Sequence, residues 1–565
     1  MKPIALPFCL LFAGVALAQA PTSKLLSLQQ LCGARPLPRL PQWSTLLDAA
    51  TPGSEDGNAD LLSVADGGNQ ARFEVGTVHD LLTELNLQAI DDNKLHLEAT
   101  GLALHAVGDA AAVARVEAQL RFASEVIARP VEIEFAAWDA TDRETPPAVM
   151  NAADFQRFAT NRMQLWRSNT ATSVGAPATL GRERWTRYVK AVNVEVAQKQ
   201  SISNPVMATF GEGGRAVVLP LPLLGDEFVL QAQFLTGQRR GVVRSVACGV
   251  PGAPDIELPT LETGYGACSA RVANGGAMAI TLRGNAAGGG QVVLTFRVTA
   301  KQPPAGNVQD GVAVLPCAAL TADGLRQRHA VPSPCRSDAA RDALDEDQYG
   351  RIDGQQLQVL LAANHLEQLE TNGGFLRVGG GFVFAKCDAP TLARIENTLR
   401  ALQDEVVRNV TISQLGTLTA ADGKADASPL LHELAMPSLL GREAIVARLL
   451  EMPFLRSIEC EIAQEASTLS PFVDTLQTGT WLRLRAAPDG ETMQLDLDLQ
   501  CAHAPLPTSR PVMPGGIVMP TEVQTATVIG NTRVGNGQAL DQGDGPTLTI
   551  DGRTCRSTLT TTLRW

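Results

Sequence analysis

The amino-acid sequence contains an internal repeat, which constrains the fold more than any local motif does. The segment DAAAVARVEAQLR (Asp109–Arg121) recurs as DAPTLARIENTLR (Asp388–Arg400), 388 − 109 = 279 positions later, and seven of the thirteen residues are identical. At the same offset, Arg72-Phe73-Glu74 recurs as Arg351-Ile352-Asp353, each followed by apolar residues at helical spacing. Unrelated segments of average composition share about one residue in thirteen. The chain is therefore expected to contain two copies of one module.

Shorter matches continue downstream with changed offsets, as expected if loops changed length between paired elements. They are PATLGRE from Pro177 and PSLLGRE from Pro437 (offset 260), VEVAQ from Val194 and CEIAQ from Cys460 (offset 266), and RVANG from Arg271 and RVGNG from Arg533 (offset 262). Each copy then spans about 220 residues, 72–301 and 351–565. Two copies favour a tandem-domain protein over a solenoid.

Periodicity within each copy predicts a strand, a helix, two strands, a second helix and another strand, followed by a β-rich region. In the first copy the opening strand is expected at 72–75, Asp109 is the predicted N-cap of the second helix, and 131–135 alternates as a strand with Glu132 and Glu134 on its solvated face. The predicted fold class is α+β: two tandem homologous modules, each a small two-helix/sheet sandwich followed by a β-rich domain. The predicted boundaries are 1–18 (signal peptide), 19–70 (N-terminal extension with a short helix near 25–31), 71–140 and 351–418 (small domains), 141–301 and 419–565 (β-rich domains) and 302–350 (linker).

The first residues have the pattern of a secretory signal. Lys2 precedes an apolar stretch from Ile4 to Ala18, which is shorter than the roughly 20 residues that span a bilayer. We expect cleavage after Ala18 and an exported protein in the periplasm, the outer membrane or the medium; contact with the membrane is left open. The net charge of −12 and the pI near 5.2 argue against nucleic acid as a partner, because phosphates require a basic surface.

Ten cysteines, of which only Cys9 lies in the signal segment, suggest disulfides in an oxidising compartment. Two of the pairings would each close a loop of about 20 residues, which contributes about 3 kcal/mol on the chain-entropy model. The odd number left after export implies at least one free or intermolecular thiol. The candidate pairs are Cys248 with Cys268, Cys317 with Cys335, and Cys460 with Cys501.

No pattern of catalytic residues is present. None of the seven histidines has HExxH spacing, and there is no CxxC, P-loop or GxSxG motif, so neither an enzyme nor a cofactor is predicted. The run from Asp345 to Asp353 partly follows the calcium-loop template, but Tyr349 and Gln356 stand at two ligand positions. The first copy has no acidic triplet before its own helix, so we expect no calcium site.

Arg-Glu pairs repeat in both copies and are the candidate interaction residues. One set belongs to the repeated LGRE segment, for which an inter-domain contact or a helix start is the alternative role. The other lies on the second helix of each small domain, opposite an apolar stripe. The candidates are Arg182, Glu183, Arg442 and Glu443 in LGRE, and Arg115, Glu117, Arg394 and Glu396 on the helices.

Several segments resemble the secretins, the outer-membrane channels of bacterial type II and III secretion. The V-x-x-[VI]-E-x-x-L-R helix followed by a V-x-[IV] strand is similar to their ring-building domains; VEVAQ…NP…GEGG…AVVLPL and PTLETGYGACSARVANGG (Pro259–Gly276) are similar to their β-domain. Two departures are the alternation of both domain types twice and the lack of a VPVLGDIP-like gate segment.

The resemblance implies an exported envelope protein that acts by assembly or protein–protein interaction, with itself or with other envelope proteins, as part of a secretion or envelope complex. A secreted ligand-binding protein without catalytic activity is the alternative. The two hypotheses differ in whether the chain forms an oligomer, so the mass of the protein in solution distinguishes them.

Overall fold

The computed structural model describes residues 21–32, 73–140, 144–197, 200–246, 253–284, 291–301, 308–309, 312–321, 352–364, 369, 374–420, 430–463, 466–504, 523–550 and 553–565. The predicted signal peptide, the acidic run at 345–347, Cys248 and Cys335 lie outside these residues. The chain divides into two compact units, one with residues up to 34 and 71–124, and one that includes 125–565.

The first unit is a small α+β domain. Its three strands form an antiparallel sheet in the order β1-β3-β2. The predicted apolar stripes are confirmed, since Val78 and Leu82 of α2 and Val113, Val116 and Leu120 of α4 are all buried. The elements are β1 (Thr22–Ser27), α1 (Gln29–Cys32), α2 (Val75–Leu85), α3 (Leu87–Asp91), β2 (Leu95–Thr100), β3 (Ala103–Gly108) and α4 (Ala110–Ile127).

Two predictions about the start of this domain are wrong. Residues 73–75 do not form part of the opening strand predicted at 72–75: Glu74 is the N-cap of α2, and the helix begins at Val75. The third strand is instead β1, from the segment predicted to be an N-terminal extension, and the short helix there is only Gln29–Cys32. Leu26 and Leu28 are buried, so β1 completes the apolar face of this sheet.

The second unit contains another small α+β domain, with a sheet in the order β15-β16-β18-β17. Asp353 and Gln356 form a capping box at α7, so Gln356 has a structural role, and Asp388 caps α9 by accepting from the backbone N of Thr391 at 2.9 Å. The predicted linker is thus partly wrong, because β16 and α6 fall within 302–350. The elements are β15 (Val308–Gln309), β16 (Val312–Pro316), α6 (Ala318–Thr321), α7 (Gly354–Ala363), β17 (Phe375–Gly379), β18 (Phe382–Lys386) and α9 (Ala389–Val406).

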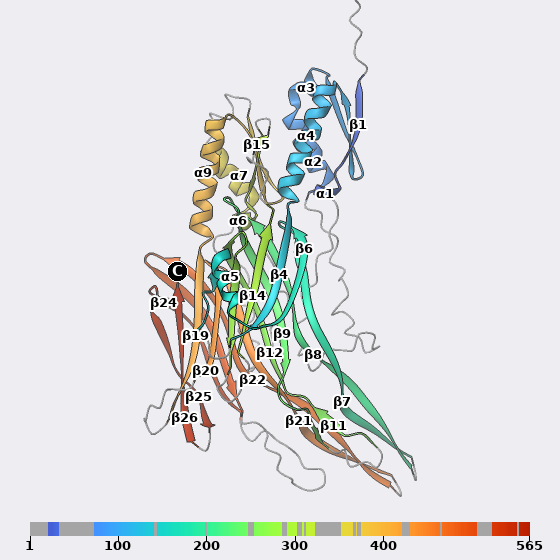
Figure 1. Cartoon of the computed structure of the whole chain (residues 1–565), viewed down its shortest axis with the longest axis vertical. Helices are drawn as coiled ribbons and strands as arrows, with labels where there is room; N and C mark the ends of the chain where they lie inside the picture. Colours follow the sequence, from blue (N-terminus) through green and yellow to red (C-terminus); the bar gives the residue numbers. More distant parts are fainter. Residues whose placement is uncertain are drawn as a thin grey trace, which may run out of the picture. The chain divides into compact units, whose positions relative to one another are not determined.

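Two large sheets form the rest of the second unit and lie face to face (Figure 1). The eight-stranded sheet has the order β24-β23-β22-β21-β12-β9-β8-β7, and the nine-stranded sheet has the order β25-β26-β19-β20-β13-β14-β4-β6, with β5 paired to β13. Phe234 of the first sheet packs against Phe296 of the second, with ring centroids 6.0 Å apart. The predicted alternation in β4 is confirmed for Val131 to Phe135, with Glu132 exposed.

The strands of the eight-stranded sheet are β7 (Ala178–Ala197), β8 (Gln200–Pro222), β9 (Glu227–Arg239), β12 (Leu261–Ala273), β21 (Glu443–Ala463), β22 (Ala466–Asp489), β23 (Thr492–His503) and β24 (Gln524–Val534). Those of the other sheet are β4 (Pro130–Asp139), β5 (Val149–Met150), β6 (Gln164–Ser173), β13 (Ala277–Arg283), β14 (Gln291–Ala300), β19 (Asn409–Ala420), β20 (Leu430–Leu439), β25 (Ala539–Ile550) and β26 (Arg553–Arg564). Helix α5 (Ala152–Thr160) and a hairpin of β10 (Arg244–Val246) and β11 (Ile256–Leu258) complete the unit.

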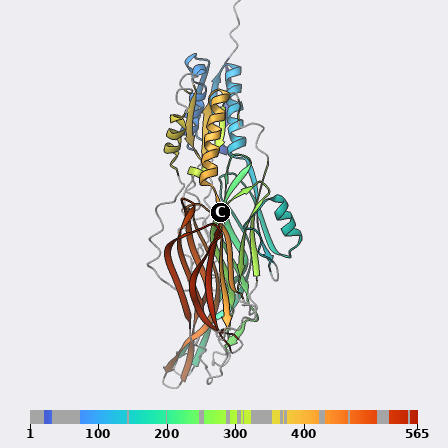
Figure 2. The ribbon, with the colours of Figure 1, turned by 90° about the vertical axis from the view of Figure 1, so that its left-hand side faces the viewer.

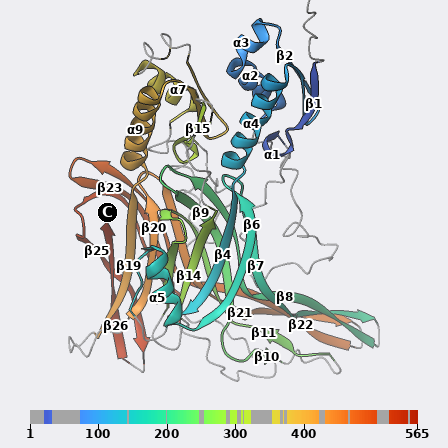
Figure 3. The same cartoon turned by 45° about the horizontal axis from the view of Figure 1, so that its top comes forward.

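The domain boundaries predicted for the β-rich regions need correction. β4 and β19 were predicted to lie in the small domains, but both belong to the nine-stranded sheet. The regions 141–301 and 419–565 are not separate β-domains either, since each large sheet contains strands from both. The long hairpins β7–β8 and β21–β22 extend beside the β10–β11 hairpin (Figure 3), where Val192 packs with Ile256 and Leu258.

Candidate interaction surfaces

The two halves of the eight-stranded sheet meet along one junction, between β12 and β21. These strands pair antiparallel from Leu261 opposite Glu451 to Ala267 opposite Ile445. Tyr265 and Glu451 are both fully buried there, and the Tyr265 hydroxyl donates to Glu451 Oε1 at 2.9 Å. Burial, followed by the Glu451 charge, raises the pKa of Tyr265 well above its usual value of 10. The junction is therefore a packed and hydrogen-bonded interior contact.

Arg448 of β21 connects this junction to the opposite sheet. Its guanidinium donates to Glu262 of β12 at 2.9 Å and to the carbonyl oxygen of Leu282, on β13, at 2.6 Å. The side chains of Arg448 and Glu262 are only 10% and 14% exposed. Burial lowers the pKa of Arg448, and the charge of Glu262 opposes this effect. A buried pair with these extra hydrogen bonds holds the strands in one register.

The nine-stranded sheet has an equivalent junction between β13 and β20. Arg283 stands opposite Glu433 in the ladder, and their side chains form an ion pair at 2.9 Å. Thr145 also donates to Glu433, at 2.5 Å. Both sheets are thus joined by an Arg–Glu pair between a strand from before residue 301 and one from after residue 419.

Sequence reasoning missed these junction residues. The available signal was that Arg448 and Glu451 interrupt the otherwise apolar run AIVARLLEMPFL of β21. A charged residue in such a run is buried only if it is paired. The glycines of the GYG segment are also informative: a Cβ at Gly266 would lie 2.4 Å from the Phe234 ring, so only glycine permits this packing.

Four strands lie at the outer edges of the two sheets. Within the described residues, β7 and β24 each pair with one neighbour in the eight-stranded sheet, as do β6 and β25 in the nine-stranded sheet. Figure 2 faces the side of the β-sandwich on which β24, β25 and β26 (red) lie. On β7, Arg182, Arg184 and Arg187 are exposed, and on β24 the side chain of Ile529 is 59% exposed. On β7, the Ser168 hydroxyl of β6 accepts from the backbone N of Gly181 and donates to its carbonyl oxygen, both at 3.2 Å, so another strand must displace this hydroxyl. Strand edges of this length can otherwise pair with another strand.

The two LGRE segments occupy different places in the eight-stranded sheet. Arg182 and Glu183 lie within β7, whereas Arg442 lies in the β20–β21 turn and Glu443 begins β21. Gly441 (φ 68°) and Gly175 (φ 65°) both have positive φ and lie 266 positions apart, whereas the two LGRE segments lie 260 apart. Both glycines donate to β-strand carbonyls that are themselves 266 positions apart, those of Pro220 and Ala486.

Glu183, Arg442 and Glu443 each form a side-chain hydrogen bond with a different residue. Glu183 accepts from Arg215 Nε at 2.8 Å, and Glu443 accepts from Arg483 Nε at 2.8 Å. Arg442 donates to the carbonyl of Ala319, on α6, at 2.9 Å. Arg442 therefore makes an inter-domain contact, while Arg182 lies exposed on the edge strand.

The helix candidates lie at matching positions of α4 and α9. Arg115 and Arg394 are exposed, and Glu117 and Glu396 are partly exposed. Glu117 accepts from Lys24 of β1 at 2.6 Å, and this hydrogen bond lowers the pKa of its carboxyl group. Glu396 pairs with an arginine one turn later on the same helix, at 3.1 Å. The two arginines are thus the candidates that a neighbour can reach.

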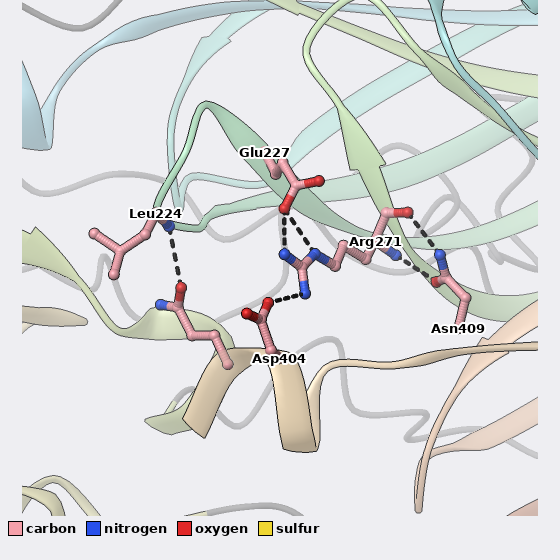
Figure 4. A network of polar contacts seen from close by, with 6 residues as sticks. Leu224, Glu227, Arg271, Asp404 and Asn409 are labelled. Carbon is pink, nitrogen blue, oxygen red and sulfur yellow. Dashed lines mark hydrogen bonds and ion pairs between the residues drawn. The ribbon is translucent and has the colours of Figure 1, made fainter. Parts of the chain in front are cut away.

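The second small domain is attached to the large sheets by a polar network (Figure 4). Arg271, near the end of β12, donates to Glu227 of β9 at 2.7 Å and to Asp404 of α9 at 2.8 Å. Its backbone N donates to the side-chain oxygen of Asn409 at 2.8 Å, and its carbonyl accepts from the same amide at 2.9 Å. The buried Gln403 accepts from the backbone N of Leu224 at 3.1 Å. These contacts fix α9 to the β8–β9 turn.

The cysteine predictions are not met in this structure. Cys268 and Cys317 are buried free thiols, and Cys501 is buried and lies 3.5 Å from the Thr480 hydroxyl. Burial raises the pKa of Cys268 and of Cys317 to about 12. The pairing of Cys460 with Cys501 is wrong on geometry: along β22 they stand opposite Leu469 and Thr480, eleven residues or roughly 36 Å apart.

A cavity opens between the two sheets. Its volume is about 210 Å³, with Trp166 and Leu294 on the apolar side and Glu212, Glu262 and Arg448 among its polar lining. Ligand pockets usually measure about 300–1,000 Å³, so this cavity has room only for a small organic molecule. In the part of the chain that the structure describes, no group of His, Cys, Asp and Glu residues could hold a metal ion. No described helix combines the length and apolarity needed to cross a membrane.

No protein-family model matches this sequence, and no curated protein is significantly similar to it. Among solved structures it is similar to the Salmonella SPI-1 type III secretion injectisome secretin InvG, with 14% identity over 36% of this chain and 77% of that chain and a TM-score of 0.18. It is also similar to the type II secretin XcpQ from Pseudomonas aeruginosa, with 10% identity over 51% and 84% and a TM-score of 0.18. A third neighbour is an ETEC pilotin–secretin complex, AspS–GspD, with 6% identity over 87% and 85% and a TM-score of 0.17. These three solved structures are of secretins or of a secretin complex.

Proposed function

We propose that this chain is an exported envelope protein that works by assembly, through contacts with copies of itself or with other envelope proteins of a secretion or envelope complex. One observation carries the proposal. Apart from β5, each large sheet consists of two groups of four paired strands joined along one junction, and among the described residues each outermost strand pairs with only one neighbouring strand. Such an arrangement can be extended at either end by the same kind of strand pairing.

The proposal includes two homologous modules in one chain. Glycines with positive φ support it, because they recur at the repeat offsets. These pairs are Gly101 with Gly380 (φ 56° and 57°), Gly213 with Gly479 (117° and 127°) and Gly275 with Gly537 (80° and 72°). Both small domains also contain a strand followed directly by a short helix, β1–α1 and β16–α6. Each module would then start earlier than the sequence matches indicate, at β1 and at β16.

The periplasm or the outer membrane is the compartment that we propose, in line with the signal-like N-terminal segment. The test is to express the full chain, separate periplasm, membrane and medium, and measure the mass of the purified protein by light scattering. Assembly predicts a mass that is a multiple of one mature chain. A protein that remains a monomer at every concentration and crosslinks to no envelope protein would contradict the proposal.

The helix faces can be tested separately from the sheet edges. Arg115→Glu and Arg394→Glu each reverse an exposed charge on α4 and α9. If the small domains contribute to assembly, each variant should form smaller oligomers with an unchanged Tm, because exposed charges contribute little to folding. Arg157→Glu on α5, at an arginine whose side chain is 77% exposed, is the matched control and should assemble normally. Equal effects at all three positions would indicate a general charge effect.

A second candidate function is ligand binding, favoured by the cavity between the sheets. The side chains of Glu262 and Arg448 pair with each other there, so the site would take a mainly apolar small molecule. A thermal-shift screen with small aromatic compounds should raise the Tm of the parent protein and not of Val292→Phe, which narrows the cavity. No shift with any compound at millimolar concentration would argue against this function.

A further inference from the structure

The two strands of the internal junction, β12 and β21, have counterparts in the sequence at the two outer edges of the same sheet. β7 corresponds to β21 at an offset of 266, as the matched glycines 213 and 479 indicate, and β24 corresponds to β12 at an offset of 262, as RVANG and RVGNG indicate. β7 and β24 are also the two outer edges of the same sheet. Since β12 pairs with β21 inside the chain, the counterpart of β12 at one edge, β24, would pair with the counterpart of β21 at the other edge, β7.

We propose that β24 of one copy of this chain pairs antiparallel with β7 of a second copy, in the register of the internal junction. This inference rests on the proposed function and names the partner, the strands and the register. The internal pair Thr263 opposite Leu449 becomes Thr525 opposite Glu183. The pair Ala267 opposite Ile445 becomes Ile529 opposite Thr179.

The nine-stranded sheet supplies matching charges at the same two sides. β6 carries Arg167 at the position equivalent to Glu433 of the internal junction (433 − 266 = 167); its side chain is 53% exposed and pairs with Glu134 of β4 at 3.5 Å. β25 carries the exposed Asp541, whereas Gly545 stands at the position equivalent to Arg283 (283 + 262 = 545). The internal Arg–Glu pair is therefore not repeated in register, but the opposite charges on the two edges favour β25 of one copy beside β6 of the next.

The contact between chains is chemically different from the internal one. Arg182 stands where the internal junction has Arg448, but Gln524 stands where it has Glu262, so the buried ion pair has no equivalent. Trp185 likewise replaces Glu451. We therefore expect an assembly with two alternating kinds of junction, a permanent one inside each chain and a weaker one between chains. Because each chain presents different strands on its two sides, the contact is head-to-tail and closes into a ring or continues as a filament.

Crosslinking between two variants that each carry one added cysteine tests the register. Thr179→Cys and Ile529→Cys are placed on separate full-length chains, mixed and oxidised; both positions are exposed. Directly opposite residues on paired antiparallel strands have Cβ atoms about 4.5–5.5 Å apart, within reach of a disulfide. The mixture should give a covalent dimer, while either variant alone should match the parent protein. Thr179→Cys mixed with Thr525→Cys is the control, because Thr525 lies four residues or roughly 13 Å out of register.

The outcomes separate this inference from the proposed function. A crosslink with Ile529→Cys and none with Thr525→Cys supports the register. If light scattering shows an oligomer but the first mixture gives no crosslink, or if the control mixture crosslinks equally, the inference is overturned while assembly stands. If the protein is a monomer at every concentration, both fail. Unchanged circular dichroism and Tm of the cysteine variants identify correctly folded samples for this comparison.

Discussion

Replacing Arg448 with methionine should weaken the junction inside the eight-stranded sheet more than any comparable surface change. The guanidinium donates to Glu262 at 2.9 Å and to the carbonyl of Leu282 at 2.6 Å. Methionine keeps much of the packing of the aliphatic part and removes both hydrogen bonds. Hydrogen bonds to charged groups contribute about 1.5–3 kcal/mol each, and breaking a buried pair by removing one partner costs about 3–5 kcal/mol. Glu262 still has Arg240 at 3.2 Å, so we expect a loss of about 3 kcal/mol in the free energy of unfolding.

The assay is urea unfolding followed by tryptophan fluorescence, on the parent, Arg448→Met, Glu262→Gln and the double variant. The double-mutant cycle should give a coupling energy of about 1–3 kcal/mol, as for side chains in direct contact. Arg485→Met with Asp496→Asn is the matched control: this pair lies at 2.9 Å between β22 and β23, its side chains are 23% and 21% exposed, and it crosses no junction. We expect about 1 kcal/mol or less there. A loss for Arg448→Met no larger than that of the control would refute the reasoning.

Three further predictions concern single buried groups. Burial, aided by the charge of Arg448, lowers the pKa of His432 from 6.5 to about 3, so between these pH values the unfolded chain binds a proton that the folded chain does not. The free energy of unfolding measured in urea should therefore be constant above pH 6.5 and fall by up to about 1.4 kcal/mol per pH unit toward pH 3. His432→Asn should show a weaker dependence on pH. Cys268 and Cys317 should remain unlabelled by iodoacetamide in the native protein at pH 8 and react after unfolding, and native labelling detected by mass spectrometry would contradict their burial. Gln403→Ala should lower the free energy of unfolding in urea by about 2–4 kcal/mol, because the buried backbone N of Leu224 and carbonyl of Pro316 lose their hydrogen bonds. Thr398→Ala on the same helix should lower it by well under 1 kcal/mol. Equal effects would show that Gln403 does not attach α9.

The sequence alone determined several of the local elements. The helical spacing of Val113, Val116 and Leu120 identified the buried face of α4, because a stripe of 3.6-residue period has only one way to be removed from water. The alternation from Val131 to Phe135 identified β4 for the corresponding reason. The position of Arg115 and Arg394 on the exposed helix face followed from the same periodicity. All of these are short-range properties of the chain.

Tertiary structure alone decided which strands pair across the two halves. The local sequence pattern does not predict whether β12 pairs with β21 or lies at the edge of a sheet, because any strand edge offers the same backbone groups. The segment around β1 read as an extension for the same reason: its partner β3 is about 80 residues away. The two LGRE segments, although identical in sequence, occupy different places in the fold: Gly181 lies within β7, whereas Gly441 lies in the turn before β21. Arg448 and Glu451 became candidates only when their burial and partners were known, since the effect of a charge depends on its surroundings and not on its place in the sequence.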